Sequence, residues 1–221
     1  MTPSHAREEI CRIGRSLFER GYVHATAGNI SVRLDDGSLL ITPTDACLGY
    51  LDPAALALLD QDGRQLSGER ASKTAVLHRR IYEQAMRWDP GTRCIIHTHS
   101  THCVALTLQS CGAELLRPIT PYFVMKVGRV PVVSYHRPGA PEAADEVAEQ
   151  IERHGLTGRP IRAVMLTRLG PTVWHDSPAA SMALLEELEE TARLVCLARE
   201  PLQPLDEGAI DELRRAFGAR W

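Results

Sequence analysis

The sequence lacks any apolar run close to the roughly 20 residues that a helix needs to cross a bilayer, so no membrane span is expected. Residues 1–9 are polar and charged, and no apolar segment typical of a signal peptide follows them. The formal net charge is only −3, which gives no strongly basic surface for nucleic acid or for an anionic membrane. These absences predict a cytoplasmic protein without nucleic-acid or membrane partners.

No Cys-x-x-Cys pair occurs, although the chain has six cysteines. That spacing is typical of zinc sites and redox centres. Without a secretory signal, the thiols are expected to be reduced and mostly buried as small hydrophobic residues. Cys94 and Cys103 flank a histidine cluster and could serve as ligands, but burial is the simpler interpretation. The remaining cysteines are Cys11, Cys47, Cys111 and Cys196.

Internal repeats, low-complexity stretches and long Pro/Gly/Ser linkers are also absent. We therefore expect residues 1–221 to form one domain, and 221 residues are enough to bury a full hydrophobic core. The hydrophobic fraction of 44% and the charged fraction of 24% are ordinary for a globular protein, so composition alone predicts nothing more specific.

Hydrophobic spacing and turn residues predict the secondary structure. Helices are expected over residues 5–20, 72–86, 100–108, 142–154, 177–199 and 207–217. Strands are expected over residues 30–34, 39–41, 56–59, 65–66, 94–97, 130–135, 163–166 and 172–174, although residues 52–53 could instead start a short helix. Because strands and helices intermingle and hairpins come early, the pattern favours an α/β or α+β fold with a mixed sheet.

The motif His97-Thr98-His99 stands at the end of a predicted strand. Residues two apart on an extended strand point to the same face, which suits two ligands of one metal ion. Strand histidines that are merely hydrogen-bonded give the same pattern, so the motif alone is a weak signal. Catalytic zinc normally takes three protein ligands, so two histidines would form an incomplete site.

Longer motifs, in order along the chain, resemble those of the class II aldolase and adducin family. These are Thr26-Ala-Gly-Asn-Ile-Ser31, Ile41-Thr-Pro-Thr44, Leu66-Ser-Gly68, Ser72-Lys73 with His78, and Ile96-His-Thr-His-Ser100. Four further segments resemble one branch, the 3-oxo-tetronate 4-phosphate decarboxylases: residues 47–52, 117–122, 135–139 and 185–192. The resemblance implies a three-layer α/β (α+β) fold, with a central mixed β-sheet flanked by helices, and a homotetramer with active sites at subunit boundaries.

The resemblance also implies the chemistry. Such enzymes use a divalent metal, usually zinc, to stabilise the enediolate or enolate that forms when a carbon–carbon bond breaks. By position, His97 and His99 are the implied ligands, and manganese or iron could replace zinc. Tyr122 is implied as a catalytic residue. The implied substrate is a small carboxylate or sugar-derived acid whose phosphorylation is left open, and the residues implied to bind its phosphate are Gly28, Asn29, Thr44, Ser72 and Lys73.

Two departures from the family pattern affect the acid/base residue and the third metal ligand. Thr74 stands four residues before His78, where relatives usually carry a glutamate, so the acid/base role there is lost or moved. Leu169 precedes a Gly-Pro pair, where relatives supply the third metal histidine. His136 and His175 are the preferred candidates to complete the metal site, and weaker candidates are His24, His102 and Glu69.

The third departure is Asp45, which follows the Thr-Pro-Thr motif where relatives often have glycine. A carboxylate there would repel a phosphate dianion by a few kcal/mol at short range. Lys73 could pair with Asp45 and cancel this charge, or Asp45 could point outward and cap the next turn.

Three functions remain open from the sequence. The preferred one is a metal-dependent carbon–carbon lyase, either an aldolase or a decarboxylase, because decarboxylation needs an electron sink more than it needs a base. The second is a repurposed non-haem iron oxygenase, in which two histidines and an acid such as Asp45 hold iron. The third is a catalytically degenerate binding protein.

Overall fold

The computed structural model describes residues 1–109 and 112–221. Within these residues an eight-stranded sheet has the order β4-β3-β2-β1-β5-β8-β7-β6, antiparallel throughout except for the parallel pair β6–β7. The strands are β1 (Asn29–Arg33), β2 (Leu39–Ile41), β3 (Ala57–Leu59), β4 (Gln65–Ser67), β5 (Cys94–His97), β6 (Val132–Val133), β7 (Ala163–Leu166) and β8 (Gly170–His175). The helices are α1 (Pro3–Glu19), α2 (Ala75–Ala85), α3 (Thr101–Leu108), α4 (Pro141–Leu156), α5 (Pro178–Leu197) and α6 (Glu207–Phe217), with a 3₁₀ turn η1 (Leu48–Tyr50) and a π-helical turn η2 (Phe123–Val127).

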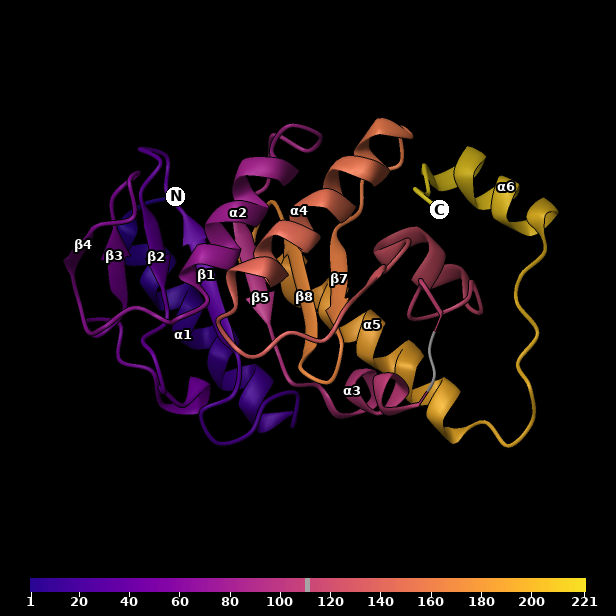
Figure 1. The fold of residues 1–221 in the computed structure, drawn as a ribbon, viewed down its shortest axis with the longest axis horizontal. Helices are drawn as coiled ribbons and strands as arrows, with labels where there is room; N and C mark the ends of the chain where they lie inside the picture. Colours follow the sequence, from indigo (N-terminus) through magenta and orange to yellow (C-terminus); the bar gives the residue numbers. More distant parts are fainter. Residues whose placement is uncertain (110–111) are drawn as a thin grey trace.

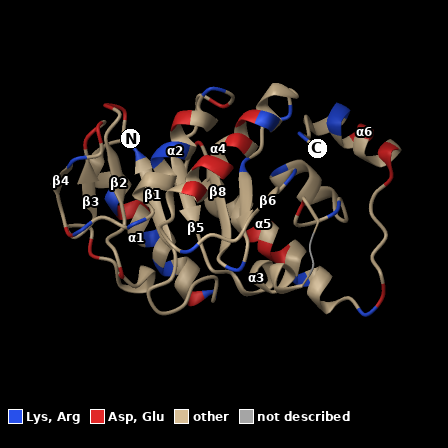
Figure 2. Cartoon of the chain, in the orientation of Figure 1, with Lys and Arg blue, Asp and Glu red and all other residues tan. Residues whose placement is uncertain are grey.

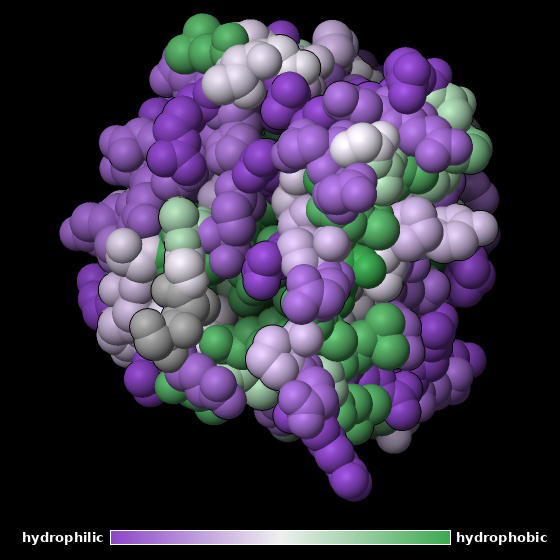
Figure 3. Space-filling model, turned by 90° about the vertical axis from the view of Figure 1, so that its right-hand side faces the viewer, coloured by the Kyte–Doolittle hydropathy of each residue, from purple (hydrophilic) through white to green (hydrophobic). Residues whose placement is uncertain are grey.

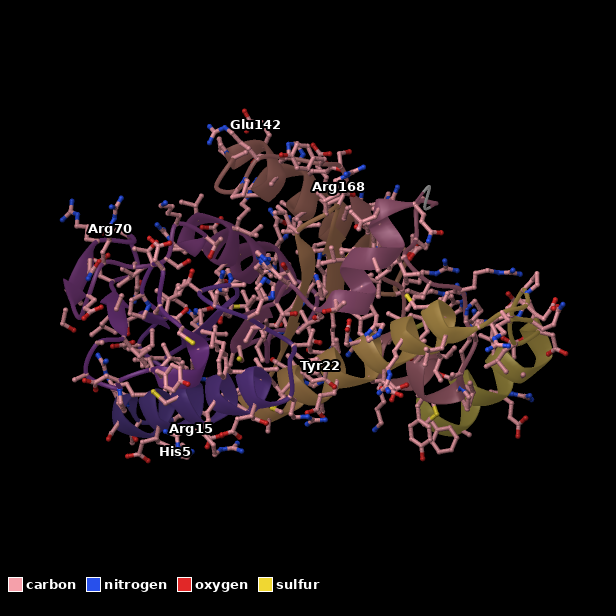
Figure 4. The ribbon with its side chains drawn as sticks, turned by 90° about the horizontal axis from the view of Figure 1, so that it is seen from below. His5, Arg15, Tyr22, Arg70, Glu142 and Arg168 are labelled. Carbon is pink, nitrogen blue, oxygen red and sulfur yellow. The ribbon has the colours of Figure 1, made fainter. Side chains whose placement is uncertain are left out.

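Helices cover both faces of the sheet, with α2 and α4 on one face and α1, α3 and α5 on the other (Figures 1 and 4). Successive strand residues alternate between the two cores. Ile95 and Trp174 pack under α2 and α4, whereas Ile96 packs under α1 and α5. A sheet buried on both faces needs apolar residues at successive positions, as these strands have. The predicted three-layer fold with a mixed central sheet is confirmed.

Most element boundaries differ from the sequence prediction by one or two residues, and three differences are larger or unexpected. The helix expected from Ser72 begins at Ala75, because residues 72–74 form a turn closed by the bond from the Ala75 N–H to the Ser72 carbonyl. The strand expected over residues 130–135 is only two residues long: β6 is the edge strand and pairs with β7, and Pro131 beside it forms only an isolated bridge, to Glu114. The turn η2 was not expected from hydrophobic spacing.

The structure also bears on the expected burial of the cysteines and on the expected lack of a membrane span. Cys94 and Cys103 are buried, Cys11 and Cys47 are half-buried, Cys196 is exposed, and all five are free thiols. Cys111 lies outside the described residues. No helix among the described residues is both long and apolar enough to span a membrane. Acidic and basic residues are interspersed along α2, α4 and α6 in Figure 2.

Candidate functional site

One cavity of about 340 Å³ lies at the end of β5, next to the N-termini of α2 and α4. It brings together most of the residues that the sequence predicted for the site, and Leu169 lines it as well. The predicted residues that line it are Gly28, Asn29, Thr44, Asp45, Ser72, Lys73, Thr74, His97 and His99.

Backbone packing fixes the position of His97 in this cavity. Its strand pairs with β1 and β8, where His97 lies opposite Asn29 and Thr172. Gly28 has a φ of +87°, and a Cβ atom there would lie 2.9 Å from the His97 carbonyl oxygen. The absence of a side chain at Gly28 therefore lets the loop before β1 approach the end of β5.

His97 and His99 have the arrangement expected of two ligands of one ion. Their ring centroids are 5.2 Å apart, and two imidazoles bound to one tetrahedral zinc at about 2 Å place their centroids about 5 Å apart. His97 Nδ1 lies 3.1 Å from the Pro171 carbonyl oxygen. Because a carbonyl only accepts, Nδ1 carries the proton in that bond and Nε2 keeps its lone pair, as in most metal-bound histidines.

Both rings favour the neutral state that a metal ligand needs. Burial lowers the pKa of His97 to about 3, with further lowering from neighbouring His99 and His78. Burial also lowers the pKa of His99, assisted by His24. At neutral pH the pair therefore presents lone pairs rather than charges.

The structure does not bring the two preferred candidates for a third ligand to this pair. His136 Nε2 lies 2.8 Å from Glu146, and His136 does not line the cavity. His175 lies opposite Cys94, three residues along the strand pair from His97 and so about 10 Å away. There it accepts a hydrogen bond from Arg162. Antiparallel register, which the sequence did not reveal, separates His175 from the site.

The weaker candidates do not complete the metal site either. His102 lies 2.8 Å from Glu189, Glu69 is exposed, and His24 is exposed with its ring centroid 6.4 Å from that of His99. Across residues 1–109 and 112–221, no cluster of three His, Cys, Asp or Glu side chains could hold a metal ion. Asp45 lines the cavity but does not join the histidines in such a cluster.

The turn before α2 forms the polar wall of the cavity. Thr74 is the N-cap residue of α2, and its hydroxyl lies 2.8 Å from that of Ser72 rather than bonding a helix N–H. Lys73 makes no ion pair with any described residue, so the pairing with Asp45 considered from the sequence is absent there. The Asn29 Oδ1 atom is buried and has no hydrogen-bond partner among the residues that the structure describes. These groups leave donors and an acceptor available to a ligand.

Asp45 adopts a left-handed backbone conformation, with a φ of +57°. Glycine adopts this conformation without strain, and aspartate is among the few other residues that tolerate it. Backbone geometry thus explains in physical terms why glycine is common at this position.

Two groups at the site were missed by sequence reasoning. Arg137 lines the cavity together with the start of α4, whereas the sequence predicted no role for this residue beyond its place in a segment that resembles one family branch. His78 is fully buried, and its Nδ1 lies 2.7 Å from the Ser31 hydroxyl, which also contacts the Tyr82 hydroxyl. The sequence placed His78 within a predicted helix but did not predict this polar link between α2 and β1.

Tyr122 is not brought to the cavity within this chain. It lies just before η2, does not line the cavity, and has 61% of its surface exposed. A catalytic role for Tyr122 would require another subunit to bring it to the site.

Comparisons with known proteins agree with this geometry. Residues 8–196 match the family described as Class II Aldolase and Adducin N-terminal domain. The 3-oxo-tetronate 4-phosphate decarboxylase of Cupriavidus necator is 50% identical over 100% of this chain and 99% of its own length. The L-fuculose phosphate aldolase of Methanococcus maripaludis is 33% identical over 84% of this chain and 93% of its own. The crystal structure of YgbL from Escherichia coli matches with a TM-score of 0.85 and 40% identity, covering 96% of this chain and 99% of that one. The chain belongs to the class II aldolase and adducin family.

Proposed function

We propose that this protein is a metal-dependent carbon–carbon lyase that decarboxylates a small phosphorylated 3-oxo sugar acid. The observation that carries the proposal is one cavity that holds both the His97/His99 pair and the polar turn at Ser72 and Lys73. Full-length identity of 50% to a 3-oxo-tetronate 4-phosphate decarboxylase supports the substrate class.

His97 Nε2 and the His99 imidazole would hold a divalent metal, with zinc as the first choice and manganese next. The pair fits such an ion through its spacing and its neutral state, while the remaining positions would fall to water and substrate oxygens. When bound there, the metal supplies Lewis-acid stabilisation of the negative charge that develops on the substrate carbonyl oxygen.

The remaining side chains bind and shield the substrate. Lys73 and Ser72 would hold the phosphate at the N-terminal end of α2, where backbone N–H groups and the helix dipole favour an anion. An apolar wall that includes Leu77, Leu166 and Leu169 limits water around the reacting carbons. Thr74 cannot accept a proton at neutral pH, which suits decarboxylation because breaking the bond to CO₂ requires no base.

A direct assay tests this function. Purified protein loaded with zinc or manganese should release CO₂ from 3-oxo-tetronate 4-phosphate, and His97→Ala should lose both metal and activity. Stoichiometric zinc or manganese in the purified protein supports the lyase. Iron together with oxygen-dependent turnover would instead support the oxygenase, and failure to bind any metal after reconstitution contradicts both.

The alternatives have less support. No acid completes a three-residue metal cluster with the histidine pair in the described part of the chain, so the predicted two-histidine, one-acid iron site is not formed there. The most similar relatives reported above carry the names of enzymes rather than of scaffolding proteins.

We also propose that the protein is a homotetramer whose sites lie at subunit boundaries. Figure 3 shows hydrophobic side chains on the face next to α6. Exposed apolar residues among the described ones include Leu108, Leu194, Leu197, Leu202 and Phe217. Burial of such residues between subunits would lower the free energy of assembly.

A further inference from the structure

Part of the cavity wall is made by the segment that leads into α4. Residues from Arg137 to Ala144 contribute to this wall. Among the residues that line the cavity, Lys73 and Arg137 are the two cations. Lys73 precedes α2 and Arg137 precedes α4, so each of the two cations lies next to a helix N-terminus at the cavity.

Arg137 has a fixed backbone and an uncommitted side chain. The Ala140 N–H donates to the Arg137 carbonyl at 3.0 Å, and Gly139 completes this turn with a φ of +79°. The guanidinium makes no hydrogen bond or ion pair with any described residue. Arg162, by contrast, binds both Asp89 and His175. Arg137 is exposed, and a guanidinium that lines a cavity without a partner among the described residues is available to bind an anionic ligand in a bidentate manner.

The start of α4 adds to the positive potential there. Its N-cap residue is Ala140, which has no side chain able to cap the helix, and Pro141 follows. The first turn therefore directs uncapped backbone dipoles toward the cavity. Glu142, the acidic residue of this turn, lies at the outer edge of α4 in Figure 4. The same cavity contains the buried, unpartnered Asn29 Oδ1, which independently indicates a ligand with a hydroxyl or amide donor.

We propose that Arg137, assisted by the N-terminus of α4, binds the carboxylate of the substrate while the α2 turn binds its phosphate. This inference rests on the proposed function. In a 3-oxo acid phosphorylated at C4, the two anionic groups lie at opposite ends of the carbon chain, and the cavity offers two separate cations, Lys73 before α2 and Arg137 before α4. Arg137 is thus a residue that distinguishes acid phosphates from neutral sugar phosphates.

Arg137 would also orient the bond that breaks. The C1–C2 bond breaks, its electron pair moves to form the C2–C3 enediolate with negative charge on the C3 oxygen, and C1 leaves as CO₂. C2 then takes a proton from water. The reaction is fastest when the C1–C2 bond stands perpendicular to the plane of the C3 carbonyl, and two anchored ends restrict the substrate to such a conformation.

Binding of two unreactive ligands tests the assignment. 4-Phosphoerythronate has both a carboxylate and a phosphate but no ketone, whereas dihydroxyacetone phosphate keeps the phosphate and lacks the carboxylate. Calorimetry on the metal-loaded protein should show that Arg137→Gln weakens 4-phosphoerythronate binding by about tenfold to a hundredfold. Binding of dihydroxyacetone phosphate should stay within about twofold of wild type.

Matched variants separate this effect from general electrostatics. Lys73→Gln should weaken both ligands, Arg137→Lys should retain part of the affinity for the acid, and Arg159→Gln, at the far end of α4, should change neither. Equal weakening of both ligands by Arg137→Gln, or no effect on either, overturns the assignment. A wild-type protein that binds both ligands yet releases no CO₂ would refute the proposed function and leave the carboxylate subsite standing. Normal CO₂ release with an unchanged KM in Arg137→Gln would support the proposed function and refute the carboxylate subsite.

Discussion

Asp45 combines a backbone conformation that favours glycine with a carboxylate that would repel an anionic substrate. Its φ of +57° favours glycine, and its carboxylate lines a cavity meant for an anion. We expect Asp45→Gly to lower KM for the phosphorylated substrate by about fivefold, because an exposed like charge costs up to about 1 kcal/mol. The value of kcat should change little, and steady-state kinetics at low salt would measure both.

Asp45→Asn is the matched control, since asparagine also tolerates the left-handed conformation but carries no charge. The two variants should behave alike if charge is the cause. A rise in KM in either variant would instead show that Asp45 binds the substrate.

Leu169 occupies the cavity wall where the family pattern has a third histidine. Leu169→His should therefore raise zinc affinity by at least about tenfold, because a third imidazole supplies the coordination that the pair lacks. Competition with a chromogenic chelator measures this affinity, and Leu169→Gln, of similar size but without an imidazole, should leave it unchanged. An unaltered affinity in Leu169→His would mean that another group already fills the third position.

At the scale of elements, the contact between β8 and the turn after β5 fixes the histidine pair. Gly170 has a φ of +142°, and a Cβ atom there would lie 1.9 Å from the Thr98 carbonyl oxygen. Gly170→Ala must move one of the two backbones, so we expect it to lower the free energy of unfolding by about 2 kcal/mol or more. It should also weaken zinc binding, because Thr98 lies between the two histidines.

Urea unfolding and chelator competition measure the two effects of Gly170→Ala. Gly91→Ala is the control, since a Cβ atom at Gly91 would meet only the Asp176 Cβ, at 3.7 Å. Stability and zinc affinity close to wild type in Gly170→Ala would mean that the β5–β8 contact does not position the pair.

The polar link between α2 and β1 makes the fold sensitive to acid. Burial lowers the pKa of His78 to about 3, from a usual value near 6.5. Between these values the unfolded chain binds a proton that the folded chain does not, so stability is full above pH 6.5 and is lost as pH falls toward 3. A single such histidine contributes a slope of about 1.4 kcal/mol per pH unit in the middle of this range.

Urea unfolding of the metal-free protein at several pH values between 4 and 7 measures this slope. We expect His78→Gln to reduce the slope of unfolding free energy against pH by about 1.4 kcal/mol per pH unit, the contribution of one histidine, even if it lowers stability overall. Exposed His5 provides the control, because His5→Gln should leave the slope unchanged. An equal slope in wild type and His78→Gln would contradict a buried neutral imidazole at this position.

Local signals predicted elements better than they predicted contacts between elements. The hairpin of β1 and β2 follows from Asp36-Gly37, and α6 has the predicted bounds because caps and hydrophobic spacing are local properties. The remote position of His175 depends on strand register, and the contribution of Arg137 depends on packing α4 beside α2. Neither is encoded in spacing along the chain, so the sequence predicted the histidine pair but not the part of the cavity wall that Arg137 contributes.

At the scale of the whole molecule, the cavity of one chain lacks one of the predicted catalytic residues. The histidine pair and the α2 turn share one cavity, whereas the predicted catalytic residue Tyr122 is exposed outside it. A site at a subunit boundary would resolve this separation, because Tyr122 could then reach the cavity of a neighbouring subunit. The resemblance to tetrameric aldolases and the exposed apolar residues both favour this arrangement.

Mixed tetramers would test whether sites are shared. His97→Ala and Tyr122→Phe should each be nearly inactive alone, since each removes one half of every site. Subunits exchanged between the two variants should recover about a quarter of wild-type activity, because that fraction of boundaries pairs an intact His97 with an intact Tyr122. Mixing His97→Ala with His99→Ala should recover nothing, because both residues line the same cavity of one chain. Light scattering would confirm that tetramers form in every mixture. Full activity of Tyr122→Phe alone would show that Tyr122 has no catalytic role. No recovery in tetramers that demonstrably contain both variants would contradict a site shared between subunits.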